Sequence, residues 1–560
     1  MVKYTTTSPY KSPSSRKRHN NNNNTNNNNN NIDNYKQVIL IILVLLLFTS
    51  FTYYSHIQLD THQQITNATP GAVKIFVTNS LKKLEDFEET LENSILHNKW
   101  ISSNRESYES YIQTLTSNSG NGNGNNINGI NDIDISSYYH QLSCPNSELL
   151  TFWKPPTLND LKYRSPFADT GPNPKYVTFE PDVGGWNNIR MQMELVIVFA
   201  AATGRILVLP PDQPMYLLDK GKGHQKAHSF ADFFPFDYIN KRLQVITMDE
   251  FMAREAITGH LKKPSGEVYY PPGNKTIFIG TDRDDRNAMW EYLRNVTSAP
   301  KWKCMKDFLV IPPGPHINVS LLPNADEYRK RRDIFAASRA PNYYDDYWQD
   351  QFVVHFISKP GLGYRLLEHF YTFIHFEDIE MDKYYKRFVR DYVHYIDTIF
   401  CTASIIIKKL LDEGNGVYSA FHIRRGEFQY KEVKISADAL MENVGNFIPA
   451  NELIYIATDD KNKSSFNPFL KRFPTIRFLD DYFELAGLGN LNPNFLGMID
   501  QVICTRGNTF VGTWFSTFSG YITRMRGYMG KLDSTIYYGD KKHRDRFQHP
   551  ELPMYPFYMR

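Results

Sequence analysis

The apolar and polar positions of the chain predict four successive segments. The first 37 residues are polar and rich in Asn, and a tail of this composition cannot bury a core. Residues 38–54 form an uncharged apolar run, close in length to the roughly 20 residues that a membrane-spanning helix needs. Residues 55–137 are polar again, with one amphipathic helical pattern from Val77 to Ile95. We therefore expect a disordered tail, a transmembrane anchor, a stem, and a globular region that begins at residue 138.

The flanks of the apolar run predict its orientation. Tyr53-Tyr54-Ser55-His56 follows the run, and this is not the small-residue cleavage site of a signal peptide, so an uncleaved signal-anchor is favoured. The residues before the run carry the basic excess, which places the N-terminus in the cytoplasm and everything after residue 55 in the lumen. We expect a single-pass type II membrane glycoprotein of the endoplasmic reticulum or the Golgi, with the choice between the two open.

Five N-x-S/T sequons agree with a lumenal location. Chance matches are expected in an Asn-rich chain, and we expect about half of the sequons to be glycosylated. The candidate asparagines are Asn67, Asn274, Asn295, Asn318 and Asn462.

The globular region opens with a β–Gly loop–α–β pattern, the arrangement of half a Rossmann unit. Tyr176–Phe179 predicts a strand, residues 190–203 predict a buried helix, and Ile206–Leu209 predicts a second strand. Between them, Gly184 and Gly185 would let the backbone approach a ligand, and Asn187 or Asn188 could donate hydrogen bonds to it. A tight turn alone explains the two glycines equally well, because their spacing is not GxGxxG.

A second strand pattern ends in a cluster of polar residues. The run that starts at Val417 leads into His422-Ile-Arg424-Arg425-Gly-Glu427, and ligands bind at the carboxyl ends of strands in open α/β sheets. By alternation His422 and Arg424 share a face, so Arg424 can reach a pyrophosphate, while Arg425 points away and is expected to pair with a carboxylate. A purely structural ion-pair cluster is the alternative. The next predicted strand, 453–457, ends at Asp459.

A third unit follows near the C-terminus. Residues 498–504 predict a helix, residues 509–511 a strand, and residues 520–526 another helix. The loop Ser516-Thr517-Phe518 lies just before that last helix, where free amides favour a phosphate and Phe518 could stack on a base. Helix capping by Ser516 or Ser519 explains each hydroxyl about as well.

Composition and charge exclude several classes of protein. The chain has 63 basic and 60 acidic side chains, a balance that argues against a nucleic-acid partner. Its four cysteines, Cys144, Cys304, Cys401 and Cys504, lack CxxC spacing and argue against a zinc site; one or two disulfides are open, with no pairing predicted. The run at 329–332 is basic, but a solvated helix face explains it better than a nuclear signal.

Together, the motifs at 184–190, 207–211, 422–428, 455–459 and 515–522 resemble those of the GDP-fucose protein O-fucosyltransferase family. The resemblance covers roughly Tyr176 to Gly527. It implies an α/β fold with two Rossmann-like domains facing across a cleft (GT-B-like). We expect the N-terminal domain at 138–410 and the domain that binds the nucleotide sugar at 411–560.

The resemblance also implies roles for individual residues. Arg424 matches the arginine that contacts the β-phosphate and assists departure of GDP, and Asp500 matches an acidic residue near the guanine and ribose. The implied catalytic residues are Arg424 and Glu427, and the implied GDP-fucose-binding residues are Gly184, Gly185, Asn187, Asn188, His422, Arg424, Asp459, Asp500, Ser516, Thr517 and Phe518. Some relatives carry a glutamate as general base where this chain has Gly185, so the base is open between Glu427 and Asp459.

The predicted activity is transfer of fucose from GDP-fucose to a Ser or Thr hydroxyl of a protein, without a metal or other cofactor. The acidic pairs Asp282/Asp284 and Asp480/Asp481 are the candidates for a metal-dependent alternative. Two further alternatives remain: a fucosyltransferase that acts on a glycan hydroxyl, and a catalytically inactive, membrane-anchored protein that binds a glycan or a peptide.

Overall fold

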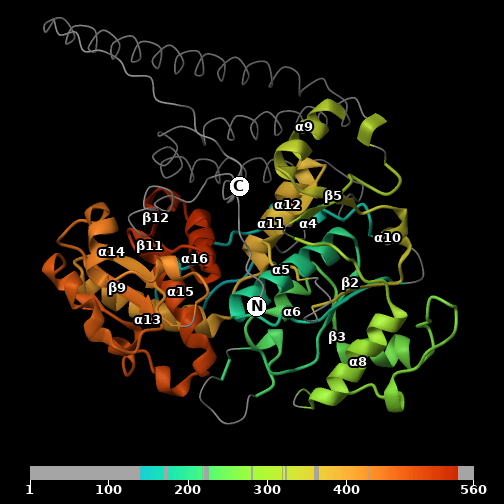
Figure 1. Ribbon diagram of the computed structural model, residues 1–560, viewed down its shortest axis with the longest axis horizontal. Coiled ribbons are helices and arrows are strands. Elements are labelled where there is room, and N and C mark those ends of the chain that lie inside the picture. The colour runs from blue at the N-terminus through green and yellow to red at the C-terminus, as the bar shows by residue number, and fades with distance from the viewer. Residues whose placement is uncertain are drawn as a thin grey trace, which may run out of the picture. The chain divides into compact units, whose positions relative to one another are not determined.

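The computed structural model describes residues 139–168, 174–216, 218–219, 226–278, 280, 282–304, 306–317, 319–321, 325–358, 365–426 and 428–539 (Figure 1). The predicted tail, anchor and stem at 1–137 lie outside these residues. Within the described ranges, no helix is both long and apolar enough to cross a membrane. The described residues belong to a single compact unit that starts at Ile130.

The first sheet has four parallel strands in the order β3-β2-β1-β6. Their runs of Val, Ile, Leu and Phe are largely buried, as expected for strands covered on both faces. The strands are β1 (Tyr176–Phe179), β2 (Ile206–Leu209), β3 (Val245–Thr247) and β6 (Val353–Phe356). Helix α5 (Trp186–Ala202) connects β1 to β2 and is buried over most of its surface. Gly204 lies just after α5 and has a φ of +66°, a left-handed conformation that ends many helices. The chain then enters β2.

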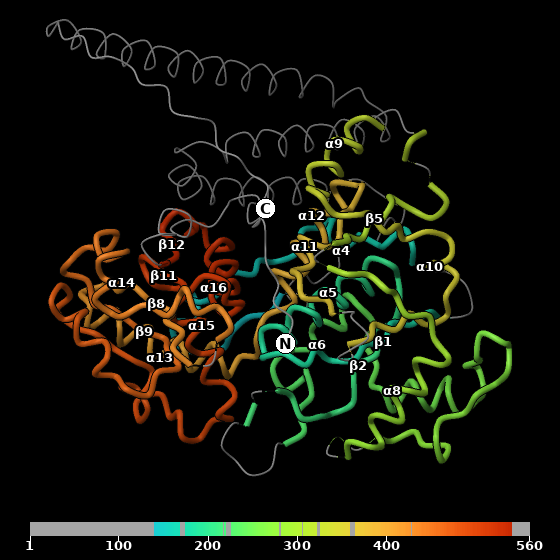
Figure 2. Tube along the Cα trace, viewed as in Figure 1, coloured from blue at the N-terminus to red at the C-terminus, as the bar shows by residue number. Residues whose placement is uncertain are grey.

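The second sheet has five parallel strands in the order β10-β9-β8-β11-β12. They are β8 (Tyr418–Ile423), β9 (Leu453–Thr458), β10 (Ile476–Arg477), β11 (Phe510–Thr513) and β12 (Thr535–Tyr538). Its helices are α13 (Asp397–Glu413), α14 (Ala437–Val444), α15 (Leu496–Arg506) and α16 (Thr517–Tyr528). In Figure 2 these orange and red elements lie side by side on the left.

A third, three-stranded parallel sheet, in the order β5-β4-β7, was not predicted. It contains β4 (Asp307–Ile311), β5 (Ala340–Tyr343) and β7 (Ile374–Phe376). The remaining helices are α4 (Leu158–Lys162), α6 (Phe236–Ile239), α7 (Met248–Phe251), α8 (Arg283–Val296), α9 (Ala325–Ala336), α10 (Asp346–Asp350), α11 (Phe370–Phe373) and α12 (Ile379–Tyr392). The described residues therefore form the predicted α/β fold with parallel sheets; the domain boundary at 410 stays a prediction.

Two helices begin earlier than predicted. Helix α5 begins at Trp186 and α16 at Thr517, not at Arg190 and Gly520. The chain turns sharply just before α16, because Phe515 has a φ of +62° and Ser516 is extended. The candidate ligand-binding residues Asn187, Asn188, Thr517 and Phe518 therefore lie in first helical turns and not in loops.

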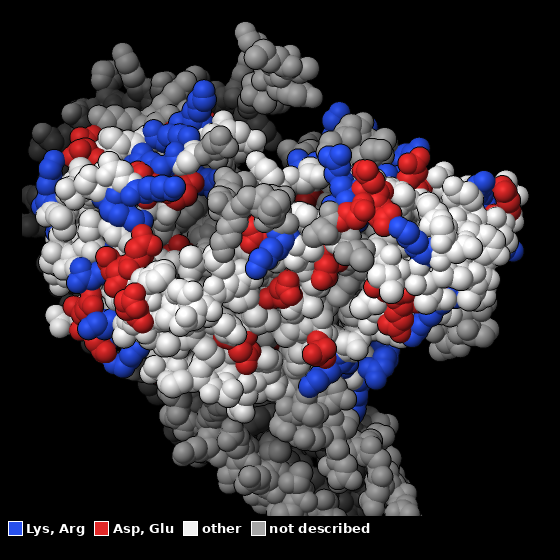
Figure 3. Space-filling model, turned by 90° about the horizontal axis from the view of Figure 1, so that it is seen from below, with Lys and Arg blue, Asp and Glu red and all other residues white. Residues whose placement is uncertain are grey.

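A disulfide joins Cys144, near the start of the described chain, to Cys401 in α13, with the two Cα atoms 5.6 Å apart. Cys304 and Cys504 are buried thiols. Three of the predicted sequon asparagines, Asn274, Asn295 and Asn462, lie exposed; Asn67 and Asn318 lie outside the described residues. On the face drawn in Figure 3, acidic and basic side chains lie interspersed in small groups.

Candidate functional site

Strand β8 carries His422 into the interior at the carboxyl edge of the second sheet. The imidazole is buried, it stacks on Phe518 with ring centroids 4.3 Å apart, and its Nδ1 lies 2.7 Å from the Ser519 hydroxyl. Burial lowers the pKa of His422 to about 3, and the nearby Arg424 adds to the shift. At physiological pH the ring is therefore neutral, so it can offer a hydrogen bond or a packing surface to a ligand but not a charge.

The turn after β8 wraps around one carboxylate. Asp459, which follows β9, accepts hydrogen bonds at Oδ1 from the backbone N–H groups of Arg425 (2.6 Å) and Gly426 (3.0 Å). Its Oδ2 lies 3.3 Å from Nε of Arg424. Burial alone would raise the pKa of Asp459, but the two N–H groups and the Arg424 guanidinium outweigh burial and lower it. An ionised carboxylate thus orients Arg424 at the sheet edge, where a guanidinium can meet phosphate oxygens.

The neighbouring Arg425 is directed to the other side of the turn. Its guanidinium donates a hydrogen bond to the carbonyl of Ile435 and lies 5.9 Å from the centre of the Phe466 ring. Phe466 belongs to the apolar core on one side of the second sheet. The two consecutive arginines therefore have separate environments, one at the candidate ligand site and one against the core, as alternation predicts. The carboxylate partner expected for Arg425 stays a prediction.

Two helix N-termini come together next to His422 and Phe518. Thr517, in the first turn of α16, donates from Oγ1 to Asn188 Oδ1 in the first turn of α5, at 3.2 Å. Gln501 of α15 donates from Nε2 to Asn187 Oδ1 at 3.0 Å and to the Phe518 carbonyl at 3.2 Å. The first N–H groups of a helix have no acceptor within it and carry the positive end of its dipole. The paired N-termini are therefore suited to bind an anion.

The two glycines before α5 have different environments. Gly184 donates from its N–H to Asp182 Oδ1 at 2.7 Å, and a Cβ on it would lie 2.7 Å from Asn188 Nδ2. Arg365 holds Asp182 with two hydrogen bonds of 2.7 Å each. Gly185 occupies the N-cap position of α5 and provides no side chain to cap it. Tight packing thus accounts for Gly184, while the amides after Gly185 are left uncapped by a side chain.

The serines at the start of α16 do not act as side-chain caps. Ser516 is at the N-cap position, but its hydroxyl makes no capping bond. Ser519 lies inside the helix, where its Oγ accepts from the Thr513 N–H at 2.9 Å and meets His422. The Ser519 hydroxyl therefore ties α16 to the ends of β8 and β11.

Asp500 lies on α15, one residue before Gln501. Its Oδ1 accepts a hydrogen bond from the Tyr455 hydroxyl at 2.5 Å. Burial raises the pKa of Asp500 to about 7, although the Tyr455 hydrogen bond opposes the shift. Gly497 lies one turn earlier on α15, and a Cβ placed on it would lie 3.7 Å from the Phe518 ring. Helix α15 therefore flanks the ring that was predicted to stack on a base.

The acidic pairs considered for a metal have structural partners. Asp282 caps α8 by accepting from the N–H groups of Asp284 and Asp285, both at 2.9 Å. Asp481 accepts from the Phe478 N–H at 2.8 Å, and Asp480 lies 3.4 Å from Nζ of Lys463. Among the described residues, no three metal-binding side chains lie close enough together to hold an ion. Glu427, the candidate catalytic base, lies outside the described residues.

A buried charge cluster behind the two N-termini was missed from the sequence. Glu194 of α5 accepts hydrogen bonds from Arg190 Nε (2.9 Å), from both terminal nitrogens of Arg524 (2.7 and 2.8 Å) and from the Tyr521 hydroxyl (3.0 Å). The cluster is almost fully buried and joins α5 to α16. An Arg–Glu pair at i, i+4 in a largely apolar, buried helix is the signal that could have identified it.

Gly426 provides a direct test of the turn around Asp459. A Cβ on Gly426 would lie 2.6 Å from Asp459 Oδ2, so Gly426→Ala must displace the carboxylate. Losing hydrogen bonds to a charged group costs about 1.5–3 kcal/mol each, so we expect GDP, the ligand that the motif resemblance implies, to bind roughly 10- to 100-fold more weakly, measured by calorimetry. The matched variant is Gly520→Ala, where a Cβ would lie 3.8 Å from His369 Nε2 and affinity should hold.

The family model described as GDP-fucose protein O-fucosyltransferase matches residues 176–529. No curated protein sequence matches the chain significantly.

Among solved structures, the chain is similar to POFUT1 in complex with GDP, at 17% identity and a TM-score of 0.34 over 66% of this chain and 100% of that one. It is similar to the fucosyltransferase NodZ from Bradyrhizobium, at 14% identity and a TM-score of 0.31 over 63% and 94% of the two chains. It is also similar to an Arabidopsis thaliana FUT1 variant in complex with GDP, at 12% identity and a TM-score of 0.33 over 71% and 78%.

Proposed function

Because the chain belongs to the GDP-fucose protein O-fucosyltransferase family, we propose that it transfers fucose from GDP-fucose to a Ser or Thr hydroxyl of a protein. The family membership confirms the resemblance drawn from the motifs, and it identifies the chain as a GDP-fucose-dependent fucosyltransferase. The observation that supports the donor site best is that the end of β8, which carries His422 and Arg424, lies next to the paired N-termini of α5 and α16. The proposed architecture is two Rossmann-like domains that face each other across the donor site.

Fucosyl transfer needs stabilisation of the negative charge that grows on GDP as the glycosidic bond breaks. In the proposed mechanism the Arg424 guanidinium, oriented by Asp459, lies against the β-phosphate, and the N-terminal amides of α16 bind the remaining phosphate oxygens. These groups are fixed before the reaction, so little reorganisation accompanies the charge development. The chemistry then requires no metal ion, because an arginine and a helix dipole supply the positive charge.

Activation of the acceptor hydroxyl requires a base. The surroundings of Asp459 argue against it for this role, because two backbone N–H groups and Arg424 stabilise its ionised form and make it a weak base. We therefore propose that Glu427 removes the proton of the acceptor hydroxyl and that Asp459 positions Arg424. The Gly-rich loop has no carboxylate for the purpose, since residue 185 is glycine and Asp182 is bound by Arg365.

We propose that the enzyme is a type II membrane protein of the secretory pathway, anchored by residues 38–54, with its catalytic part in the lumen of the endoplasmic reticulum or Golgi. The Cys144–Cys401 disulfide supports this location, since disulfides persist in oxidising compartments. The exposure of Asn274, Asn295 and Asn462 supports glycosylation there. Mass spectrometry of the intact protein before and after deglycosylation tests the location.

The pKa of Asp500 predicts a pH dependence of donor binding. A guanine that donates N–H groups to Asp500 favours the ionised carboxylate. Below pH 7 the Asp500 carboxyl is mostly protonated, so it must lose its proton before guanine can bind. GDP should therefore bind about tenfold more weakly at pH 6 than at pH 8 because of this group. The phosphates of GDP titrate in the same range, so the measurement compares wild type with Asp500→Asn, which should lose the part of the pH dependence due to Asp500. An identical pH dependence in the two proteins would contradict guanine recognition by Asp500.

The acceptor class is tested by product analysis. The full-length enzyme is incubated with GDP-fucose, EDTA, and separate panels of folded secretory-domain proteins and free N- and O-glycans. Release of fucose from a modified protein by β-elimination, with the site mapped to Ser or Thr, is the expected result. Fucose found only on glycans would reassign the acceptor, and turnover restored only by added metal would contradict the metal-independent mechanism.

A further inference from the structure

A pocket of about 470 Å³ lies at the carboxyl edge of the third sheet, which the donor site does not use. Pro312 follows β4, Tyr344 follows β5, and Glu377 follows β7, and all three residues line the pocket. The three strands are parallel, so their carboxyl ends open into the same space. In open α/β sheets ligands bind at this edge.

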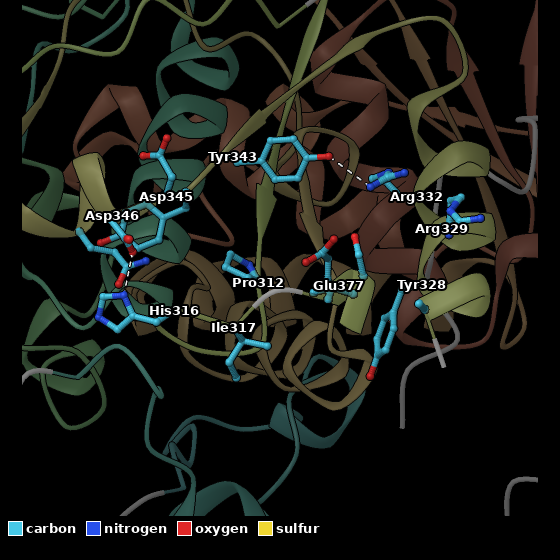
Figure 4. A pocket seen from close by; sticks show the side chains of 15 residues that line it. Pro312, His316, Ile317, Tyr328, Arg329, Arg332, Tyr343, Asp345, Asp346 and Glu377 are labelled. Carbon is cyan, nitrogen blue, oxygen red and sulfur yellow. Dashed lines mark hydrogen bonds and ion pairs between the residues drawn. The ribbon is translucent and has the colours of Figure 1, made fainter. Parts of the chain in front are cut away.

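Helix α9 forms one wall of the pocket. Arg331 ties the helix to the end of β7 by donating to the carbonyls of Glu377 (2.9 Å) and Phe376 (3.3 Å). Arg332, on the same helix, donates to the Tyr343 hydroxyl at 3.2 Å. Figure 4 shows Glu377 near the centre of the lining side chains, with Arg332 on one side and the paired His316 and Asp346 on the other.

Most of the charged groups that line the pocket have a partner close by. Arg329 lies 3.1 Å from Asp326, and His316 lies 3.0 Å from Asp346. Asp345 caps α10 by accepting from the Trp348 N–H at 3.2 Å.

Glu377 differs from these groups. The residue is only 4% exposed, and in the part of the chain that the structure describes no donor forms a hydrogen bond with its carboxylate. Burial raises the pKa of this carboxyl, although Arg332 and Arg331 oppose the shift. The carboxylate oxygens of Glu377 are still reached by solvent from the pocket, and the hydroxyl groups of a ligand can replace that water as hydrogen-bond donors.

The charges of the lining favour a neutral ligand. An anion would face the Glu377 carboxylate at the floor, and a cation would face Arg329 and Arg332 on α9. A polyhydroxylated ligand can donate to Glu377, accept from Arg332 and pack on the rings of Tyr328 and Tyr343. We propose that this pocket binds a neutral sugar residue, as a glycan-binding site separate from the GDP-fucose site.

The test uses saturation-transfer NMR on the full-length protein in a sugar-free detergent, with GDP at saturation. The protein is enzymatically deglycosylated, because Ser320 on the pocket wall belongs to a predicted sequon. The probes are the methyl glycosides of fucose, mannose, galactose and N-acetylglucosamine. We expect at least one to bind with a millimolar Kd and to bind about tenfold more weakly to Glu377→Ala, from which the buried acceptor is missing. Arg424→Ala should bind that probe normally.

A second variant keeps the test decisive if Glu377→Ala does not fold. Tyr343→Ala removes a ring that is 41% exposed, so folding should be retained while the probe binds more weakly. Saturation transfer to none of the four probes would overturn the proposal. Equal transfer in wild type and both pocket variants, or displacement of the probe by inorganic phosphate, would overturn it as well.

Discussion

Replacing Arg424 with alanine is expected to lower kcat for fucosyl transfer by about 10²–10³-fold, the usual loss when one preorganised contact to a developing negative charge is removed. The effect should fall on kcat more than on KM, because the charge on GDP grows in the transition state. Arg424→Lys should recover only part of the rate, since an ammonium group lacks the planar fork that fits two phosphate oxygens. Steady-state kinetics with a fixed acceptor measure both parameters.

Arg425→Ala is the matched control, because the two arginines are neighbours in sequence but differ in environment. The Arg425 guanidinium donates to Ile435 and lies over Phe466, away from Asp459 Oδ2. Its loss should reduce stability slightly and leave kcat within a few-fold of wild type. Equal losses in the two variants, or a folded Arg424→Ala enzyme with wild-type kcat, would contradict the role assigned to Arg424.

Glu194→Ala is expected to destabilise the fold by about 3–5 kcal/mol, the usual cost of leaving a buried charge without its partner. The Glu194 side chain is 1% exposed, and its removal leaves Arg190 and Arg524, each 2% exposed, without their common carboxylate. Because Glu194 joins α5 to α16, donor affinity should fall in the variant even under conditions where it is folded. Urea unfolding monitored by Trp fluorescence measures the stability change.

A surface pair and a pH series provide the controls for Glu194. Glu267 is 64% exposed and paired with Lys263, so Glu267→Ala should lower the free energy of unfolding by less than about 1 kcal/mol. Burial alone would raise the pKa of Glu194, but Arg524 and Arg190 lower it to about 2. The stability that Glu194 contributes should therefore be complete above about pH 5 and disappear as the pH falls toward 2. A difference between wild type and Glu194→Gln that does not change over this range would contradict the assigned ionisation.

The elements predicted well from sequence are those whose pattern has a local cause. The strands at 176–179 and 206–209 have the predicted bounds, since both are short β-prone runs with Gly or Pro within two residues of each end. The second sheet was anticipated around His422 and Asp459 for the same reason. In the unpredicted third sheet, β5 is the exposed sequence Ala-Pro-Asn-Tyr, which has the composition of a loop and becomes a strand only by pairing with β4.

The sequence predicted which strand ends carry the residues of the candidate site. It did not predict the contacts between those residues. The sequence placed His422, Arg424 and Asp459 at the edge of one sheet. It did not indicate that Asp459 bonds the backbone of the turn, nor that Thr517 meets Asn188. Such contacts join residues far apart in the chain, and their geometry depends on how α5 and α16 pack around Glu194. Long-range packing of this kind leaves no periodic signal.

The most direct test of the central claim is calorimetric titration of GDP into the full-length protein with EDTA present, alongside Arg424→Ala. We expect micromolar binding without metal and its loss, or a large reduction, in the variant. Failure of the folded protein to bind GDP, or equal binding by wild type and Arg424→Ala, would contradict a GDP-fucose site built on Arg424.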